Sequence, residues 1–210
     1  MVDTLQTRPA SKSAPGPLTS PFAGHEGGAF PNAAGEIGVV LTTSLLPGTA
    51  LVSTWISGID GLCTALNNAW GALPAKTGQT SSTPAGLVMR TGPEEFLVLP
   101  EDGKDIARSL REIVTPDIGS VTDLGHARCR IHIEGMRCNA TLGKLFPLDL
   151  RGAAFPVGEV RLTGTHHVPC VLHRLGADSF DMLVFSTYAY DQLSTVLDAA
   201  LEFGVKLSLQ

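Results

Sequence analysis

Residues 126–134 read HARCRIHIE, and they alternate between apolar and polar side chains without interruption. In a strand, Ala127, Cys129, Ile131 and Ile133 point to one face and the intervening residues point to the other. This period of two is the clearest strand signal in the chain. It predicts a strand with one buried apolar face and one polar face.

Further strands and helices are predicted on both sides of this segment. Segments rich in β-branched and apolar residues predict strands at 37–43, 49–56, 87–90, 96–100, 160–165, 168–174 and 180–185. Apolar residues at helical spacing predict one helix that begins with Asp60 as N-cap, and others at 103–115, 136–145 and 187–203. Residues 74–86 are predicted to form a loop. Helices mixed with antiparallel hairpins favour an α+β fold, with antiparallel or mixed sheets and packed helices.

The domain organisation follows from a change in composition near residue 36. Residues 1–35 are rich in Pro, Ser, Thr, Ala and Gly and have no hydrophobic period, which predicts a flexible or partner-bound N-terminal tail. Residues 36–210 are predicted to form a single α+β domain. The strand–helix layouts at 96–115 and 180–203 are alike. They suggest two pseudo-duplicated, ferredoxin-like halves, 36–118 and 119–210.

The charge of the chain argues against nucleic-acid binding, and its composition is unusually poor in charged residues. The net charge is −5 and no basic tract is present, so nucleic acid is not expected as a partner. Charged residues make up 17% of the chain, against roughly 25% in an average domain. Two explanations remain open: a surface covered by another chain, or a composition that favours Ala and Gly.

No membrane segment is expected. The uncharged stretch 37–59 is broken by Pro47-Gly48, which is typical of a turn between strands rather than a membrane-spanning helix. The N-terminus has no secretory pattern. The four cysteines form no CxxC pair, which predicts reduced thiols and a cytoplasmic protein.

Common catalytic and metal-binding patterns are absent from the sequence. It has no GxGxxG, GxxxxGK[ST], HExxH or GxSxG pattern, so no nucleotide, phosphate, zincin or hydrolase site is indicated. Cys129, His132 and Cys138 are residue types that bind metals, but strand alternation puts Cys129 and His132 on opposite faces. No metal site is predicted.

Two histidines and two acids are candidate catalytic groups. If His166 and His167 lay on a strand, at most one would reach a given pocket, and a position in a hairpin turn is favoured over a catalytic base. Asp149 and Asp181 stand alone in the sequence, so they do not indicate a paired-carboxylate mechanism. The sequence therefore predicts no catalytic or cofactor-binding residue.

Several segments together resemble the gamma subunit of heterotetrameric sarcosine oxidase. The similarity covers roughly residues 86–204 and rests on the order and spacing of short motifs. These are TGPEEFLVL at 91–99, HAR at 126–128, PLDL at 147–150 with AFP at 154–156, THHVP at 165–169 with LHR at 172–174, and FDMLV at 180–184.

The resemblance implies a fold like the folate-binding domain of aminomethyltransferases. It also implies a non-catalytic subunit in a complex with alpha, beta and delta subunits. That complex oxidatively demethylates sarcosine to glycine, transfers the one-carbon unit to tetrahydrofolate and produces hydrogen peroxide. FAD, FMN, NAD, zinc and tetrahydrofolate would then belong to the partner subunits, and none to this chain.

Two surface patches are candidates for contact with such partners. Between residues 37 and 75 only Asp60 is charged, and both Trp55 and Trp70 lie there, as is typical of interface centres. Arg128 and Arg130 lie on the polar face of the strand at 126–134, where two guanidinium groups suit partner carboxylates. For both patches the other interpretation stays open: the chain's own core for the first, a solvated face for the second.

Two alternative functions remain open. In the first, the chain is a stand-alone folate-binding or one-carbon transfer protein. In the second, it is a gamma-type subunit of a complex that acts on another N-methylated amino acid. The first alternative requires an acidic residue that grips the pterin and a lined central cavity, and the sequence identifies neither.

Overall fold

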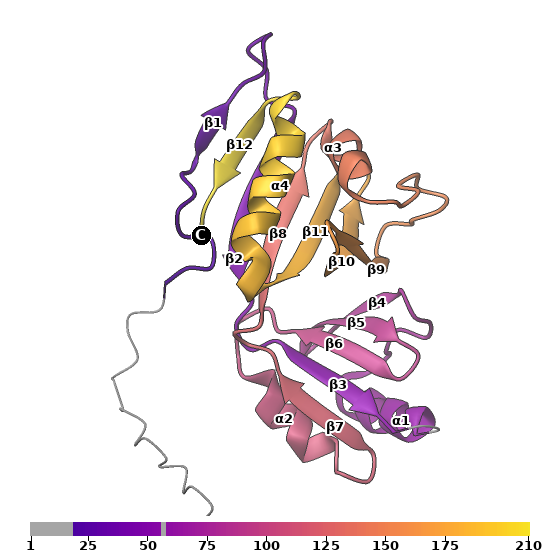
Figure 1. The fold of residues 1–210 in the computed structure, drawn as a ribbon. Coiled ribbons are helices and arrows are strands. Elements are labelled where there is room, and N and C mark those ends of the chain that lie inside the picture. The colour runs from indigo at the N-terminus through magenta and orange to yellow at the C-terminus, as the bar shows by residue number, and fades with distance from the viewer. Residues whose placement is uncertain (1–18, 56–57) are drawn as a thin grey trace, which may run out of the picture.

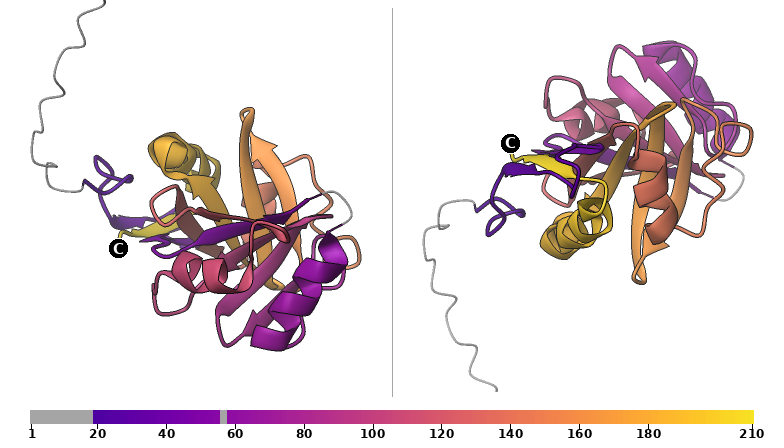
Figure 2. Two further views of the ribbon diagram at one scale, coloured as in Figure 1. Left: turned by 90° about the horizontal axis from the view of Figure 1, so that it is seen from below. Right: turned by 90° about the horizontal axis from the view of Figure 1, so that it is seen from above.

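The chain has the α+β fold that the sequence predicts, with two sheets and four α-helices in the described residues (Figure 1). The structure is a computed structural model and describes residues 19–55 and 58–210. Helices α3 and α4 pack on one face of the larger sheet, and α1 and α2 pack on the smaller sheet (Figures 1 and 2). The predicted strand residue Ile56 and the predicted tail residues 1–18 lie outside the described residues.

The larger sheet has seven strands in the order β1-β12-β2-β8-β11-β10-β9. All neighbours are antiparallel except β12 and β2, which are parallel. The strands are β1 (Gly28–Phe30), β2 (Val39–Leu45), β8 (Arg128–Glu134), β9 (Val160–Thr165), β10 (Val168–Gly176), β11 (Ser179–Phe185) and β12 (Val205–Ser208). Its helices are α3 (Cys138–Leu145) and α4 (Ala189–Leu201), the latter preceded by a 3₁₀ turn at Ser186–Tyr188.

The smaller sheet has five antiparallel strands in the order β4-β5-β6-β3-β7. Its strands are β3 (Ala50–Thr54), β4 (Thr80–Thr83), β5 (Gly86–Gly92), β6 (Glu95–Leu99) and β7 (Gly119–Asp123). Its helices are α1 (Ile59–Trp70) and α2 (Ile106–Ile113). The two sheets meet across a small apolar core made by Leu46, Met89, Leu97, Leu99, Val160, Val171 and Leu183.

The two sheets are built from units with the same order of elements. One unit runs β3-α1-β4-β5-β6-α2-β7 and the other runs β8-α3-β9-β10-β11-α4-β12. Each unit therefore contains the strand–helix–hairpin–helix–strand order of a ferredoxin-like fold. The boundaries differ from the predicted halves at 36–118 and 119–210, because β7 pairs in the smaller sheet and β2 inserts between β12 and β8 in the larger one.

Local geometry is repeated as well. The N–H of Gly78 donates to the carbonyl of Arg90 at 2.8 Å, and the N–H of Gly158 donates to the carbonyl of Arg174 at 2.8 Å. Both glycines have a positive φ, and a bulge follows each arginine. Each guanidinium lies over a phenylalanine of the next strand, at 5.4 and 5.1 Å. The two units therefore contain hairpins with the same local geometry.

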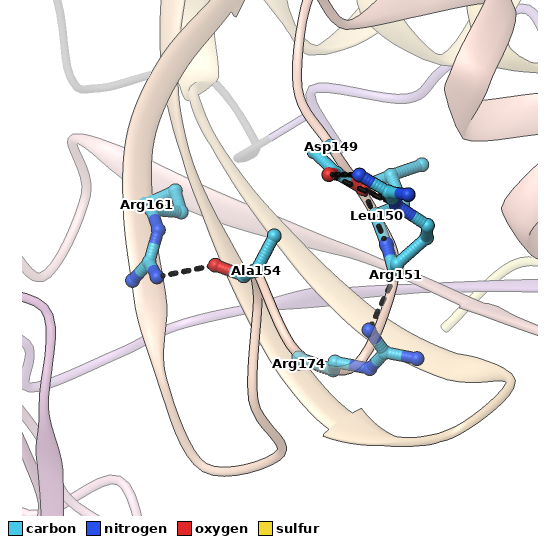
Figure 3. A network of polar contacts seen from close by, with 6 residues as sticks. All are labelled: Asp149, Leu150, Arg151, Ala154, Arg161 and Arg174. Carbon is cyan, nitrogen blue, oxygen red and sulfur yellow. Dashed lines mark hydrogen bonds and ion pairs between the residues drawn. The ribbon is translucent and has the colours of Figure 1, made fainter.

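Arg174 fixes the loop at 146–158, which contains the PLDL and AFP motifs (Figure 3). Its buried guanidinium donates to the carbonyls of Leu150 at 2.6 Å and Phe155 at 2.9 Å, and to two carbonyls of its own hairpin. In the same loop, Arg151 pairs with Asp149 and lowers the pKa of that carboxyl to about 2. The expectation that Asp149 stands alone was wrong, because its partner lies only two residues away.

The helix ends differ in detail from the sequence-based expectation. Asp60 was predicted to cap α1, but the cap is Gly58 and Asp60 lies in the first turn. For α2, the side chain of Asp105 accepts a hydrogen bond from the N–H of Arg108 and so caps the helix. Strand β4 forms inside the predicted loop at 74–86, and β1, β7 and β12 had no predicted counterpart.

Part of the predicted tail is built into the larger sheet. Phe22 is almost completely buried in the core beneath α4, and β1 pairs with β12. The expectation of a flexible or partner-bound tail was wrong for residues 19–35, because their few apolar side chains find partners in strands far along the sequence. The expectation for residues 1–18 stays a prediction.

Replacement of Arg174 by Lys is expected to lower the free energy of unfolding by about 3 kcal/mol, because one ammonium group cannot donate to all four carbonyls that the guanidinium serves. Urea denaturation monitored by circular dichroism measures this change. The matched control is Arg90→Lys, at the equivalent position in the other unit. The guanidinium of Arg90 donates two hydrogen bonds, and both are exposed to solvent. Equal destabilisation by the two variants would contradict the anchoring role of Arg174.

Candidate functional site

The candidate site is built from a row of polar residues across four strands of the larger sheet. The strand registers place Thr42 opposite His132, His132 opposite Asp181, and Asp181 opposite His173. Directly opposed residues share a face and lie close enough for their side chains to touch. This face is the one turned toward the smaller sheet, because the next row contains Leu183 of the inter-sheet core.

Asp181 is the centre of this row. Its buried carboxylate accepts a hydrogen bond from Nδ1 of His132 at 2.7 Å and contacts Nη1 of Arg130 at 3.5 Å. The Nε of Arg130 donates to the hydroxyl of Ser44 at 3.0 Å. The expectation that Asp181 has no partner was wrong, because pairing of β8 with β11 joins residues that are far apart in the sequence. An acid inside the apolar run 180–185 was the signal that a partner must exist.

The two histidines of the row have opposite electrostatic environments. The hydrogen bond to Asp181 raises the pKa of His132. Burial lowers the pKa of His173, whose side chain is 3% exposed and whose Nδ1 has no hydrogen-bond partner among the described residues. His173 therefore favours the neutral form, while His132 favours the charged form beside the carboxylate.

Two adjoining cavities open onto this row. The first, of about 330 Å³, is lined by Arg130, His132 and Asp181, with Thr42, Ser44, Leu175 and Gln210. The second, of about 500 Å³, shares Arg130, Asp181 and Leu175 with the first and also reaches His173. Thr49, Ser82, Glu101 and Gly103 also line it, together with six leucines and prolines: Leu45, Leu46, Pro47, Leu87, Leu99 and Pro100. The sequence identified neither an acidic residue in a cavity nor the cavity itself.

The residues predicted to contact a partner lie in different environments. Trp55 is 54% exposed, and its Nε1 donates to the carbonyl of Pro116 at 2.7 Å. Trp70 packs against the core of the smaller sheet. Arg128 lies over the ring of Phe185 at 3.6 Å, and burial lowers the pKa of its guanidinium.

The other histidines and the cysteines that the sequence offers as candidates lie outside the site. Cys129 is buried among the helices' core residues, on the face of β8 opposite to His132, as alternation predicted. His166 and His167 form the turn between β9 and β10, both with positive φ, so the hairpin-turn interpretation is confirmed. The four cysteines are unpaired, and burial raises the pKa of Cys138 to about 11 and of Cys170 to about 12. Within residues 19–55 and 58–210, no group of three candidate ligands is arranged to hold a metal ion.

The raised pKa of His132 predicts a pH-dependent contribution to stability. Its charged form stabilises the fold fully below the unfolded pKa of about 6.5, and this contribution is lost as the pH rises through the raised folded pKa. The difference in unfolding free energy between the wild type and His132→Gln should therefore be larger at about pH 6 than at about pH 8.5. Urea unfolding at both pH values measures it, and a constant difference would contradict the pairing with Asp181.

His173→Phe provides a control with the opposite sign. Because burial lowers the folded pKa of His173, the wild type should lose stability relative to this variant as the pH falls below about 6.5. If both variants show the same pH trend, the two histidines do not have the different environments described above.

Comparison with known proteins shows similarity to one kind of oxidase subunit. The chain is 29% identical over 133 residues to the sarcosine oxidase gamma subunit of Corynebacterium sp. strain U-96, covering 63% of this chain and 65% of that protein. It is 27% identical over 150 residues to the gamma subunit of Corynebacterium sp. strain P-1, covering 71% and 74%. The alignment with the first relative thus spans slightly less than two thirds of that relative's length. No family model matches the chain.

Solved structures show the same similarity. A chain of heterotetrameric sarcosine oxidase from Corynebacterium sp. U-96, solved with pyrrole 2-carboxylate, superposes with a TM-score of 0.71 at 26% identity, covering 82% of this chain and 88% of that chain. The glycine cleavage system aminomethyltransferase T of Bartonella henselae superposes with a TM-score of 0.60 at 16% identity, over 82% of this chain and 48% of that chain, which shows a shared fold. No helix in the described part of the chain is long and apolar enough to cross a membrane. In sequence the chain resembles gamma subunits of sarcosine oxidase, and in fold it resembles a chain of a heterotetrameric sarcosine oxidase.

Proposed function

We propose that this chain is a non-catalytic, gamma-type subunit of a cytoplasmic, heterotetrameric sarcosine oxidase. The observation that carries the proposal is similarity in both sequence and fold: 29% identity to a sarcosine oxidase gamma subunit, and a TM-score of 0.71 to a chain of a solved heterotetrameric sarcosine oxidase. In the proposed complex, alpha, beta and delta subunits oxidise sarcosine to glycine, pass the one-carbon unit to tetrahydrofolate and release hydrogen peroxide. FAD, FMN, NAD, zinc and tetrahydrofolate belong to those partners.

The chemistry of this chain's own side chains supports a structural role. Three of its four thiols are buried, and burial raises the pKa of each, which disfavours the reactive thiolate. Arg128 stacks on Phe185 within the chain, and Arg130 is partly engaged by Ser44 and Asp181. Trp55, in contrast, leaves half of its surface exposed in a segment with one charge, which suits a partner interface.

Purification of the tagged chain from its native source tests the proposed assembly. We expect a yellow preparation with three further polypeptides and sarcosine-dependent formation of hydrogen peroxide. A colourless preparation that contains this chain alone would contradict the proposal. If the complex oxidises a different N-methylated amino acid instead of sarcosine, the subunit assignment stands and the substrate changes.

Trp55→Ala is expected to reduce recovery of the partner subunits about tenfold at limiting concentration, since buried tryptophans dominate interface energies. Quantitative co-purification from cells that express the whole complex measures this effect. The control is Tyr188→Ala, which removes another half-exposed aromatic residue, at the start of α4 on the larger sheet. Equal recovery with the two variants would exclude Trp55 from the interface.

A second candidate function is folate binding by the chain itself. It is favoured by Asp181, a buried acid in the wall of a cavity of about 500 Å³, within a fold shared with an aminomethyltransferase. Calorimetric titration of the isolated chain with tetrahydrofolate separates the two functions. Saturable binding favours the second candidate, whereas no binding favours the structural subunit.

A further inference from the structure

We infer that the cavity between the two sheets is a binding site for a small aliphatic monocarboxylic acid. Its carboxylate lies against the guanidinium of Arg130, and its aliphatic body lies among the leucines and prolines that line the cavity. This inference is independent of the proposed subunit function, since every wall of the cavity comes from this chain.

The hydrogen bonds of Arg130 leave part of its guanidinium free. Nε is used by Ser44, and Nη1 makes one long contact of 3.5 Å to Asp181. A guanidinium has five N–H donors, so the outer edge retains donors that no described residue accepts. The side chain remains 39% exposed and lines both cavities. That edge matches the two oxygens of a carboxylate.

His173 provides a second, independent indication of a ligand. The residue is 3% exposed and lines the larger cavity, yet its Nδ1 has no hydrogen-bond partner among the described residues. A buried polar atom without a partner costs about 1–3 kcal/mol, so such atoms concentrate where a ligand or an ordered water completes the site. The imidazole stands beside Asp181 in the strand register, on the same wall as Arg130.

The charges around the cavity select a monoanion. Asp181 and Glu101 both line the larger cavity, and their carboxylates repel a dianion such as a phosphate monoester about twice as strongly as a monoanion. The carboxylate of Asp181 is paired with His132 and Arg130, and Glu101 is exposed, so that water screens its charge. A single negative charge therefore fits the donors that remain.

The leucines and prolines that line the cavity determine the rest of the ligand. They are Leu45, Leu46, Leu87 and Leu99 with Pro47 and Pro100, and Leu45 is 52% exposed at this position. A cavity of about 500 Å³ is within the ordinary size range of small-molecule sites. An acid with a short aliphatic chain covers these leucines and places its charge on Arg130.

Calorimetric titration of the full chain with acetate, butyrate and hexanoate, in buffer free of carboxylates, tests the inference. The affinity should rise by roughly fourfold for each added methylene that becomes buried. Hexanol and hexylamine, which have the same aliphatic body with a neutral or cationic head, should bind at least about tenfold more weakly than hexanoate. No saturable binding of hexanoate, or equal binding of hexylamine, would overturn the inference.

Variants test whether the acid binds at this cavity. Arg130→Gln should weaken hexanoate binding at least about tenfold, whereas Arg111→Gln, which removes an exposed charge on α2, should leave it unchanged. His173→Phe removes only an unpartnered polar group, so it should weaken binding without destabilising the free chain near neutral pH. Because the His173 variant is expected to fold, the test holds even if Arg130→Gln does not.

Two outcomes would place the binding elsewhere. Unchanged affinity in both variants would show that hexanoate binds outside the cavity and would overturn the inference. Binding of tetrahydrofolate without binding of any short acid would also overturn it, and would favour the second candidate function instead.

Discussion

The strict alternation of side chains along β8 is the constraint on which the rest of the molecule depends. Its apolar residues Cys129, Ile131 and Ile133 are fully buried beneath α3 and α4. Its polar residues Arg130 and His132 face the smaller sheet and meet Asp181 there. A shift of register by one residue would bury the charges among the helices and expose the apolar set, so the hydrophobic core fixes the position of the polar row.

The duplicated architecture explains why a cavity exists between the sheets. Each unit covers one face of its sheet with its own two helices, and the uncovered faces meet through a small apolar core. The units also touch where Gly78 accepts a hydrogen bond from the N–H of Val160 at 2.7 Å, beside the repeated hairpins. This core does not fill all of the space between the sheets, and polar residues such as Arg130 and Asp181 line the cavities that remain.

Local patterns in the sequence predicted the elements with strong periodicity. The strand at 126–134, the hairpin at 160–174 and the last helix were confirmed, as was the α+β class. Strands β1, β7 and β12 were missed because they are short and carry polar or glycine residues. No local sequence pattern identifies them, and only their pairing with distant strands defines them. The contact of His132 with Asp181 depends on strand register between remote segments, which a period along one segment cannot report.

The position of β12 has a consequence for how the chain is made. This strand lies between β1 and β2. Among the strands of residues 19–55 and 58–210, it alone pairs with β1 or with the outer edge of β2. During synthesis from the N-terminus, neither β1 nor the outer edge of β2 can pair with β12 until residues 205–208 have left the ribosome. The smaller sheet, whose strands all lie between residues 50 and 123, can close before then. Until β12 is synthesised, the backbone groups at the outer edge of β2 are unpaired and available to pair with other polypeptides. A chaperone or a neighbouring polypeptide would have to cover this edge.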